Sequence, residues 1–170
     1  MKVRFLLFLF PFLLLACTHS QPEVCSPDGE LVLSFRLTED GAPEYSVSRW
    51  CDSVLLWSPL GLQTEEADLS TGFMLKGIKK GSHDEVWETV WGEERFIRDH
   101  HNRMLVCLQH ASGVKMQIAF RCFNDGVALR YEFPDYEGKM TVTDEKTAYR
   151  FTENHDVWSI PWRTEYYEGL

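Results

Sequence analysis

The chain has 170 residues and a formal net charge of −9, with 44% hydrophobic, 14% aromatic and 25% charged residues. This composition is typical of a folded globular protein and excludes a disordered or fibrous chain. The acidic balance argues against a nucleic-acid partner, which requires a basic surface. The length suits one domain of ordinary size and excludes a (β/α)₈ barrel, which needs about 250 residues.

Residues 1–16 are predicted to be a lipoprotein signal peptide. Lys2 and Arg4 form a short basic start, and residues 5–15 are almost wholly Phe and Leu. This apolar run is shorter than the roughly 20 residues that span a bilayer, and it matches the hydrophobic region of a secretory signal. It ends in Leu-Leu-Ala-Cys, which resembles a bacterial lipobox with Cys17 as the lipidated first residue. An ordinary cleaved signal that happens to precede a cysteine is the alternative.

Lipidation of Cys17 predicts an exported protein that is anchored by lipid at the outer membrane or the periplasmic face. Thr18, rather than Asp, follows the cysteine, which resembles the sorting signal for outer-membrane delivery. Two or three fatty chains anchor a protein far more firmly than one. Residues 17–27 contain two prolines and are interpreted as a short lipidated tether. Residues 28–170 would then form the folded domain.

This domain is expected to be an all-β antiparallel sandwich of many short strands. Apolar and polar residues alternate with the period of two that marks a half-buried strand. The alternation covers residues 31–38, 45–48, 104–109, 114–121 and 127–133. Turn-forming residues at 112–113 and 124–126 join the last three segments into a meander, and Pro134 ends it. Residues 62–70 are interpreted as a short helix or a loop.

Four cysteines remain besides Cys17, and in an exported protein they could form disulfides in three pairings. They are Cys25, Cys51, Cys107 and Cys122. Cys107 lies off the apolar face of its predicted strand, whereas Cys122 lies on it. A Cys107–Cys122 disulfide is therefore not expected unless a bulge shifts the register. No Cys-x-x-Cys spacing is present, which argues against a zinc ribbon or a redox motif.

The run Asp-His-His-Asn at residues 99–102 has the residue types of a metal site but not the spacing. Adjacent histidines on a strand point to opposite faces and chelate one ion poorly. The run is therefore interpreted as a turn between strands.

Residues 87–94 read Trp-Glu-Thr-Val-Trp-Gly-Glu-Glu and suggest sugar contacts. Indole rings stack on sugar faces, and carboxylates accept hydrogen bonds from hydroxyls. Trp87 and Trp91 are thus carbohydrate-contact candidates. The alternative, which the usual burial of large aromatics favours, places Trp87, Val86 and Val90 in the core.

No catalytic residue is identified in the sequence. The adjacent glutamates at 65–66 and 93–94 are expected to be solvated, whereas glycoside hydrolysis needs two carboxylates that face one bond. The aromatic and acidic segment 158–170 adds Trp158 and Trp162 as carbohydrate-contact candidates. It is interpreted as a chain cut before its next structural element, with an ordinary frayed end as the alternative.

The order of motifs along the chain resembles the N-terminal domain of glycoside hydrolase family 97. The most specific motif is Arg-Cys-Phe-Asn-Asp-Gly-Val-Ala-Leu-Arg-Tyr-Glu-Phe-Pro at residues 121–134. The other motifs lie at residues 26–29, 41–48, 58–62, 84–87, 90–94 and 97–102. The resemblance extends from about Ser26 to Leu170.

This resemblance implies a galactose-mutarotase-like β-super-sandwich that braces a catalytic barrel. The family hydrolyses α-glucosides or α-galactosides, so an oligosaccharide and the barrel of the same or a split protein are the implied partners. The family's catalytic carboxylates belong to the barrel, which implies that this chain is inactive alone. The resemblance also implies that one Glu of the domain binds an active-site calcium ion. Spacing from Pro161 favours Glu168 for this role, with Glu165 as the alternative.

A single carboxylate cannot hold calcium, so these residues alone are expected to bind it weakly or not at all. Two other interpretations of the whole chain remain. It could be a stand-alone, lipid-anchored carbohydrate-binding module that uses the four tryptophans already named. It could also be a pseudogene product with an exposed apolar flank.

Overall fold

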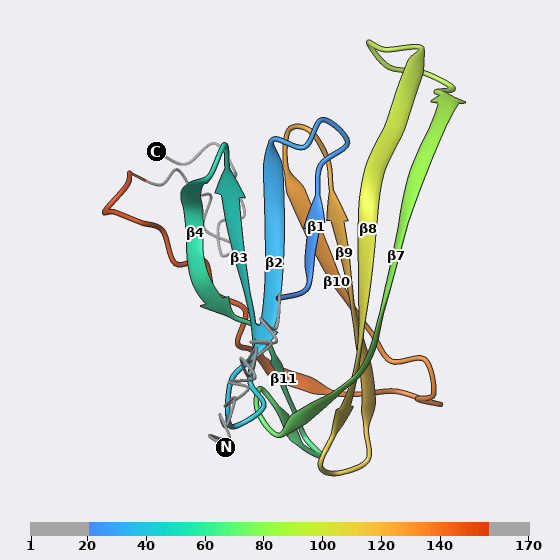
Figure 1. Ribbon diagram of the computed structural model, residues 1–170. Coiled ribbons are helices and arrows are strands. Elements are labelled where there is room, and N and C mark those ends of the chain that lie inside the picture. The colour runs from blue at the N-terminus through green and yellow to red at the C-terminus, as the bar shows by residue number, and fades with distance from the viewer. Residues whose placement is uncertain (1–20, 157–170) are drawn as a thin grey trace, which may run out of the picture.

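The computed structural model describes residues 21–156, which fold as an antiparallel β-sandwich with no helix in that range (Figure 1). The predicted signal peptide and Cys17 lie outside the described residues. The first sheet has the order β1-β2-β3-β4. Its strands are β1 (Glu23–Cys25), β2 (Leu31–Leu37), β3 (Pro43–Arg49) and β4 (Asp52–Pro59). The all-β sandwich expected from the sequence is confirmed.

The second sheet has the order β10-β9-β8-β7 and consists of a long hairpin followed by the predicted meander. Its strands are β7 (Phe73–Glu88), β8 (Phe96–His110), β9 (Lys115–Cys122) and β10 (Val127–Glu132). A third, small sheet has the order β11-β5-β6. Its strands are β5 (Leu62–Thr64), β6 (Asp68–Leu69) and β11 (Val142–Glu145).

The core lies between the first and second sheets, where the apolar positions of each alternation meet. In β2, Leu33 and Phe35 are buried while their neighbours are half-buried. The ring of Phe120 in β9 lies 6.0 Å from that of Phe35 and 6.5 Å from that of Tyr45, centroid to centroid. β8 and β9 also bury Val106 and Ile118 completely. Aromatic and branched side chains of both sheets therefore close the sandwich.

The C-terminal part of the described chain runs across both sheets and ties them together. Arg150 donates its backbone N–H to Ser58 Oγ at 2.9 Å, and its carbonyl accepts from Leu56 N–H at 2.8 Å. The half-buried phenol of Tyr131 accepts from Gly61 N–H at 3.0 Å and lies 2.6 Å from Thr147 Oγ1. Burial raises the pKa of Tyr131, so this hydroxyl stays neutral as a hydrogen-bonding group.

Three local interpretations from the sequence were wrong. The predicted tether does not extend to residue 27, because Glu23–Cys25 form β1 of the first sheet and Val24 is buried in the core. Residues 62–70 contain β5 and β6 rather than a helix or a simple loop. These strands have three residues and two residues, too few to show an alternation. Residues 99–102 lie inside β8 rather than in a turn, because β8 continues in register with β7 as far as Phe96.

The strand pairing confirms that Cys107 and Cys122 do not face each other. Cys107 lies opposite Gln117, and Cys122 lies opposite Asn102. All four described cysteines are free. Burial raises the pKa of the Cys122 thiol to about 11, and its Sγ donates to the carbonyl of Leu31 at 3.7 Å. This cysteine acts as a small apolar core residue.

The turn between β3 and β4 supports a prediction about stability. Arg49 pairs with Asp52, so Trp50 and Cys51 form a two-residue loop with φ values of 50° and 73°. Positive φ at both positions favours Asn or Gly there, because a Cβ is strained in this region. We expect Cys51→Gly to raise the free energy of unfolding by about 0.5–1 kcal/mol in urea denaturation. Cys51→Ala, which keeps the Cβ, should leave it unchanged, and equal stabilisation by both variants would contradict this explanation.

Candidate functional site

The hairpin of β7 and β8 extends beyond the rest of the second sheet (Figure 1). β9 pairs with β8 only from Gln109 to Asn102, whereas β7 pairs with β8 as far as Phe96. The outer part of the hairpin, residues 84–99, is therefore a two-stranded ribbon without a third strand. We call these residues the hairpin tip.

The hairpin tip exposes most of its large apolar side chains. Trp91 is 88% exposed, Trp87 is 48% exposed and Val90 is 98% exposed. The core interpretation of Trp87, Val86 and Val90 was therefore wrong, because no layer of the sandwich reaches this far. Exposed apolar residues in one contiguous segment are typical of an interaction site. The other exposed apolar residues of the tip are Val86, Phe96 and Ile97.

Ion pairs link the two strands of the hairpin tip. Arg98 donates from Nε and Nη2 to the two carboxylate oxygens of Asp84, each at 2.7 Å. This guanidinium holds the pKa of Asp84 below its usual range. Arg95 donates to Glu88 at 2.8 Å, and Thr89 Oγ1 donates to the carbonyl of Glu94 at 2.6 Å. Both arginines of the tip are thus paired, but the tip carries six carboxylates and stays acidic, and its ion pairs are solvent-exposed and individually weak.

The base of the hairpin contains a buried histidine. His101 is 3% exposed, and its Nδ1 lies 2.6 Å from Asp99 Oδ1. Its ring lies 5.2 Å from that of His83 and 4.9 Å from that of Phe123, centroid to centroid. His100 is only half-buried and, as its neighbour on the strand, points to the opposite face. Within residues 21–156 no group of three or more His, Cys, Asp or Glu side chains could hold a metal ion.

Of the predicted site residues, the structure brings Trp87 and Trp91 together on the hairpin tip. The others lie outside the described residues: Cys17, Trp158, Trp162, Glu165 and Glu168. The glutamates at 65–66 and 93–94 are exposed, as expected. Within residues 21–156 no helix is long and apolar enough to cross a membrane.

Sequence reasoning overlooked a group of basic residues on the outer face of the second sheet. Arg103, Arg121 and Arg130 occupy polar positions of the alternations in β8, β9 and β10. The signal was present in the sequence, because an antiparallel meander places such positions on one face.

Comparison with known proteins identifies the family. The chain matches the family described as Glycosyl-hydrolase 97 N-terminal over residues 24–170. It therefore belongs to the N-terminal domains of glycoside hydrolase family 97, which confirms the resemblance seen in the sequence. A probable retaining α-galactosidase from Streptomyces bingchenggensis is 31% identical over 125 residues, which cover 74% of this chain and 19% of that protein.

Solved structures that share the fold include an enzyme of this family. A family 97 enzyme from Pseudoalteromonas sp. strain K8, solved in complex with panose and with acarbose, superimposes with a TM-score of 0.71. It is 29% identical in the panose complex and 28% in the acarbose complex, and each match covers 77% of this chain and 20% of that enzyme. A β-arabinopyranosidase gives a TM-score of 0.71 and 30% identity, covering 78% of this chain and 21% of that one. The chain spans about a fifth of the length of these relatives.

Proposed function

We propose that this chain is the N-terminal β-sandwich of an exported family 97 glycoside hydrolase acting on α-glucosides or α-galactosides. Its family membership over residues 24–170 carries this proposal. The relatives support the substrate class, since one is a probable α-galactosidase and another was solved with panose and acarbose. The sandwich would brace a catalytic barrel of the same or a split protein.

The hairpin tip is the part of the described chain best suited to contact that barrel. It projects beyond the sandwich, and it carries apolar residues that the sandwich leaves uncovered (Figure 1). Burial of these side chains by a neighbouring domain would be favourable, because it removes apolar surface from water. Ion pairs of Arg98 with Asp84 and of Arg95 with Glu88 link the two strands of the ribbon.

We propose further that Glu168, or alternatively Glu165, binds a calcium ion at the active site of the assembled enzyme. A carboxylate is a suitable hard ligand for calcium, which takes six to eight oxygen ligands. The remaining ligands would have to come from the barrel and from substrate or water. The chain by itself would therefore hold calcium weakly at most.

The proposed export rests on the basic start, the apolar run and the cysteine at position 17. Acyl chains on Cys17 would place the sandwich at the membrane surface, at the outer membrane or its periplasmic face. Metabolic labelling with a radioactive fatty acid should mark the wild-type chain and not Cys17→Ser. Equal labelling of both chains would refute acylation at this residue.

The scaffold role predicts that the purified chain does not hydrolyse chromogenic α-glucosides or α-galactosides, because the opposed carboxylates that hydrolysis needs would belong to the barrel. The DNA downstream of the Leu170 codon should encode a (β/α)₈ barrel, in frame or in a shifted frame.

Calorimetry of the purified chain with calcium alone should show weak or no binding. Turnover by the purified chain, or tight stoichiometric calcium binding, would contradict the proposal.

A second candidate function is a stand-alone carbohydrate-binding module, which the exposure of Trp91 and Trp87 favours. Exposed indoles can stack on sugar rings. In this case tryptophan fluorescence should change saturably as maltooligosaccharides are added, and Trp91→Ala should abolish most of the change. Trp50→Ala is the matched control, because Trp50 is 65% exposed on a turn of the first sheet. The scaffold function predicts no saturable change in either variant or in the wild-type chain.

A further inference from the structure

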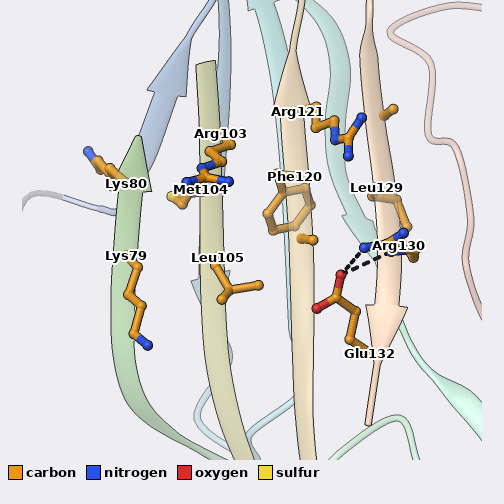
Figure 2. Close-up of a pocket in the computed structure, with 12 residues that line it drawn as sticks. Lys79, Lys80, Arg103, Met104, Leu105, Phe120, Arg121, Leu129, Arg130 and Glu132 are labelled. Atoms are coloured by element: carbon orange, nitrogen blue, oxygen red, sulfur yellow. Dashed lines mark hydrogen bonds and ion pairs between the residues drawn. The ribbon is translucent and has the colours of Figure 1, made fainter. Parts of the chain in front are cut away.

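The outer face of the second sheet forms an open groove with a volume of about 490 Å³ (Figure 2). The groove crosses all four strands of the sheet, β7 to β10. Figure 2 shows Lys79 on one side of it, and Arg121 and Arg130 on the other. Its volume lies within the range of sites for small ligands, about 300–1,000 Å³.

Strand register places four cations around an apolar floor. Across the sheet, one row of directly paired residues consists of Gly81, Arg103, Arg121 and Ala128. The next row on the same face consists of Lys79, Leu105, Ala119 and Arg130. The two arginines of the first row are therefore neighbours, and the cations of the second row lie at its two ends. The floor between them is made of Leu105, Ala119 and Ala128.

The arrangement of charges is unusual for a sheet face that serves only stability. Arg103 and Arg121 lie directly opposite each other, and like charges in such a pair destabilise a sheet. Neither these two residues nor Lys79 forms an ion pair with any carboxylate in the described part of the chain. Arg130 alone is paired, with Nε donating to Glu132 Oε1 at 2.9 Å. The groove is thus a positive region on a chain whose net charge is −9.

The identity of the occupant follows from the groove's floor and rim. Arginine guanidinium groups bind carboxylates and other planar or tetrahedral oxyanions through two parallel hydrogen bonds. The small apolar floor suits the C–H face of a sugar ring, and the Glu132 carboxylate can accept from a hydroxyl. A peptide strand would need free backbone groups, but β8 and β9 are paired on both sides. An acidic saccharide would place its anionic groups against the arginines at the rim and its sugar ring on the apolar floor.

We propose that this groove binds an acidic oligosaccharide, whose carboxylate or sulfate groups are held by Arg103, Arg121 and Lys79. This site is separate from the hairpin tip and independent of the proposed role in hydrolysis of neutral α-glycosides. An anionic ligand would neutralise the Arg103–Arg121 pair, so its binding would also stabilise the sheet.

Calorimetric titrations of the purified chain at low salt test the proposal. The probes are a trigalacturonate, a sulfated tetrasaccharide, maltotetraose and a tetraglutamate peptide. We expect saturable binding of one or both acidic saccharides and weakening with added salt, because exposed charges are screened. The two acidic probes distinguish carboxylate from sulfate as the recognised group. In a Trp91→Ala chain, which lacks the sugar-stacking residue of the hairpin tip, equal binding of maltotetraose or of the peptide, or no binding of either acidic saccharide, would overturn the proposal.

Variants assign the binding to the groove. Arg103→Gln with Arg121→Gln should raise the Kd about tenfold or more, since each residue would lose a charged hydrogen bond. The matched control, Arg49→Gln with Lys146→Gln, removes two exposed cations that lie outside the second sheet. An equal loss of affinity in the control would overturn the assignment. The groove variant should unfold at no lower urea concentration than the wild type, because it removes a repulsive pair.

Ala119→Glu provides an independent check of the same site. It places a negative charge on the floor of the groove without removing any cation. This substitution should abolish binding of the acidic saccharides at low salt. Unchanged affinity in a folded Ala119→Glu variant would exclude the groove as the binding site. These titrations do not depend on the proposed role in a glycoside hydrolase, so their outcome would be the same if that role were refuted.

Discussion

Contact between the inner faces of the two large sheets determines the rest of the structure. Phe35 and Tyr45 of one sheet meet Phe120 of the other, and all three side chains are almost fully buried. Side chains alternate along a strand, so burial of Met104 and Phe120 forces Arg103 and Arg121 outward. A slip by one residue would bring arginines into the core, which makes the register strongly specified. The alternation of side chains along β8 and β9 therefore produces both the core on one face and the basic groove on the other.

The sequence predicted those parts of the fold in which one strand face is buried. The alternations of β2 and β9 were clear because both strands have a buried and a solvent-facing side. β7 was missed, because it lies at an edge of its sheet and its residues 76–83 are mostly charged, glycine or polar. The aromatic residues of the hairpin tip suggested a core, and only tertiary structure reveals that nothing in residues 21–156 covers them. The hydrophobic pattern of a strand predicts which side chains are buried only where a second sheet packs against that strand.

The hairpin tip and the groove differ in how their charges are satisfied. At the tip, Arg98 and Arg95 are paired with Asp84 and Glu88, and the uncovered surface is apolar. In the groove, the floor is small and the positive charge of Arg103 and its neighbours is largely unpaired. An exposed apolar surface suits a domain contact or stacking on a sugar. An unbalanced basic surface suits an anion, so the two surfaces call for different partners.

The separation of these surfaces from the core explains how one small sandwich can support both. The core around Phe120 is built from side chains of β2, β3, β8 and β9. No residue of the hairpin tip, residues 84–99, belongs to it. Changes at the tip or on the outer face therefore leave the inner packing intact, since neither contributes a fully buried side chain to it. The relatives share the sandwich at about 30% identity over a fifth of their length. The shared sandwich is therefore explained by the packing of its inner faces, on which neither the hairpin tip nor the outer face depends.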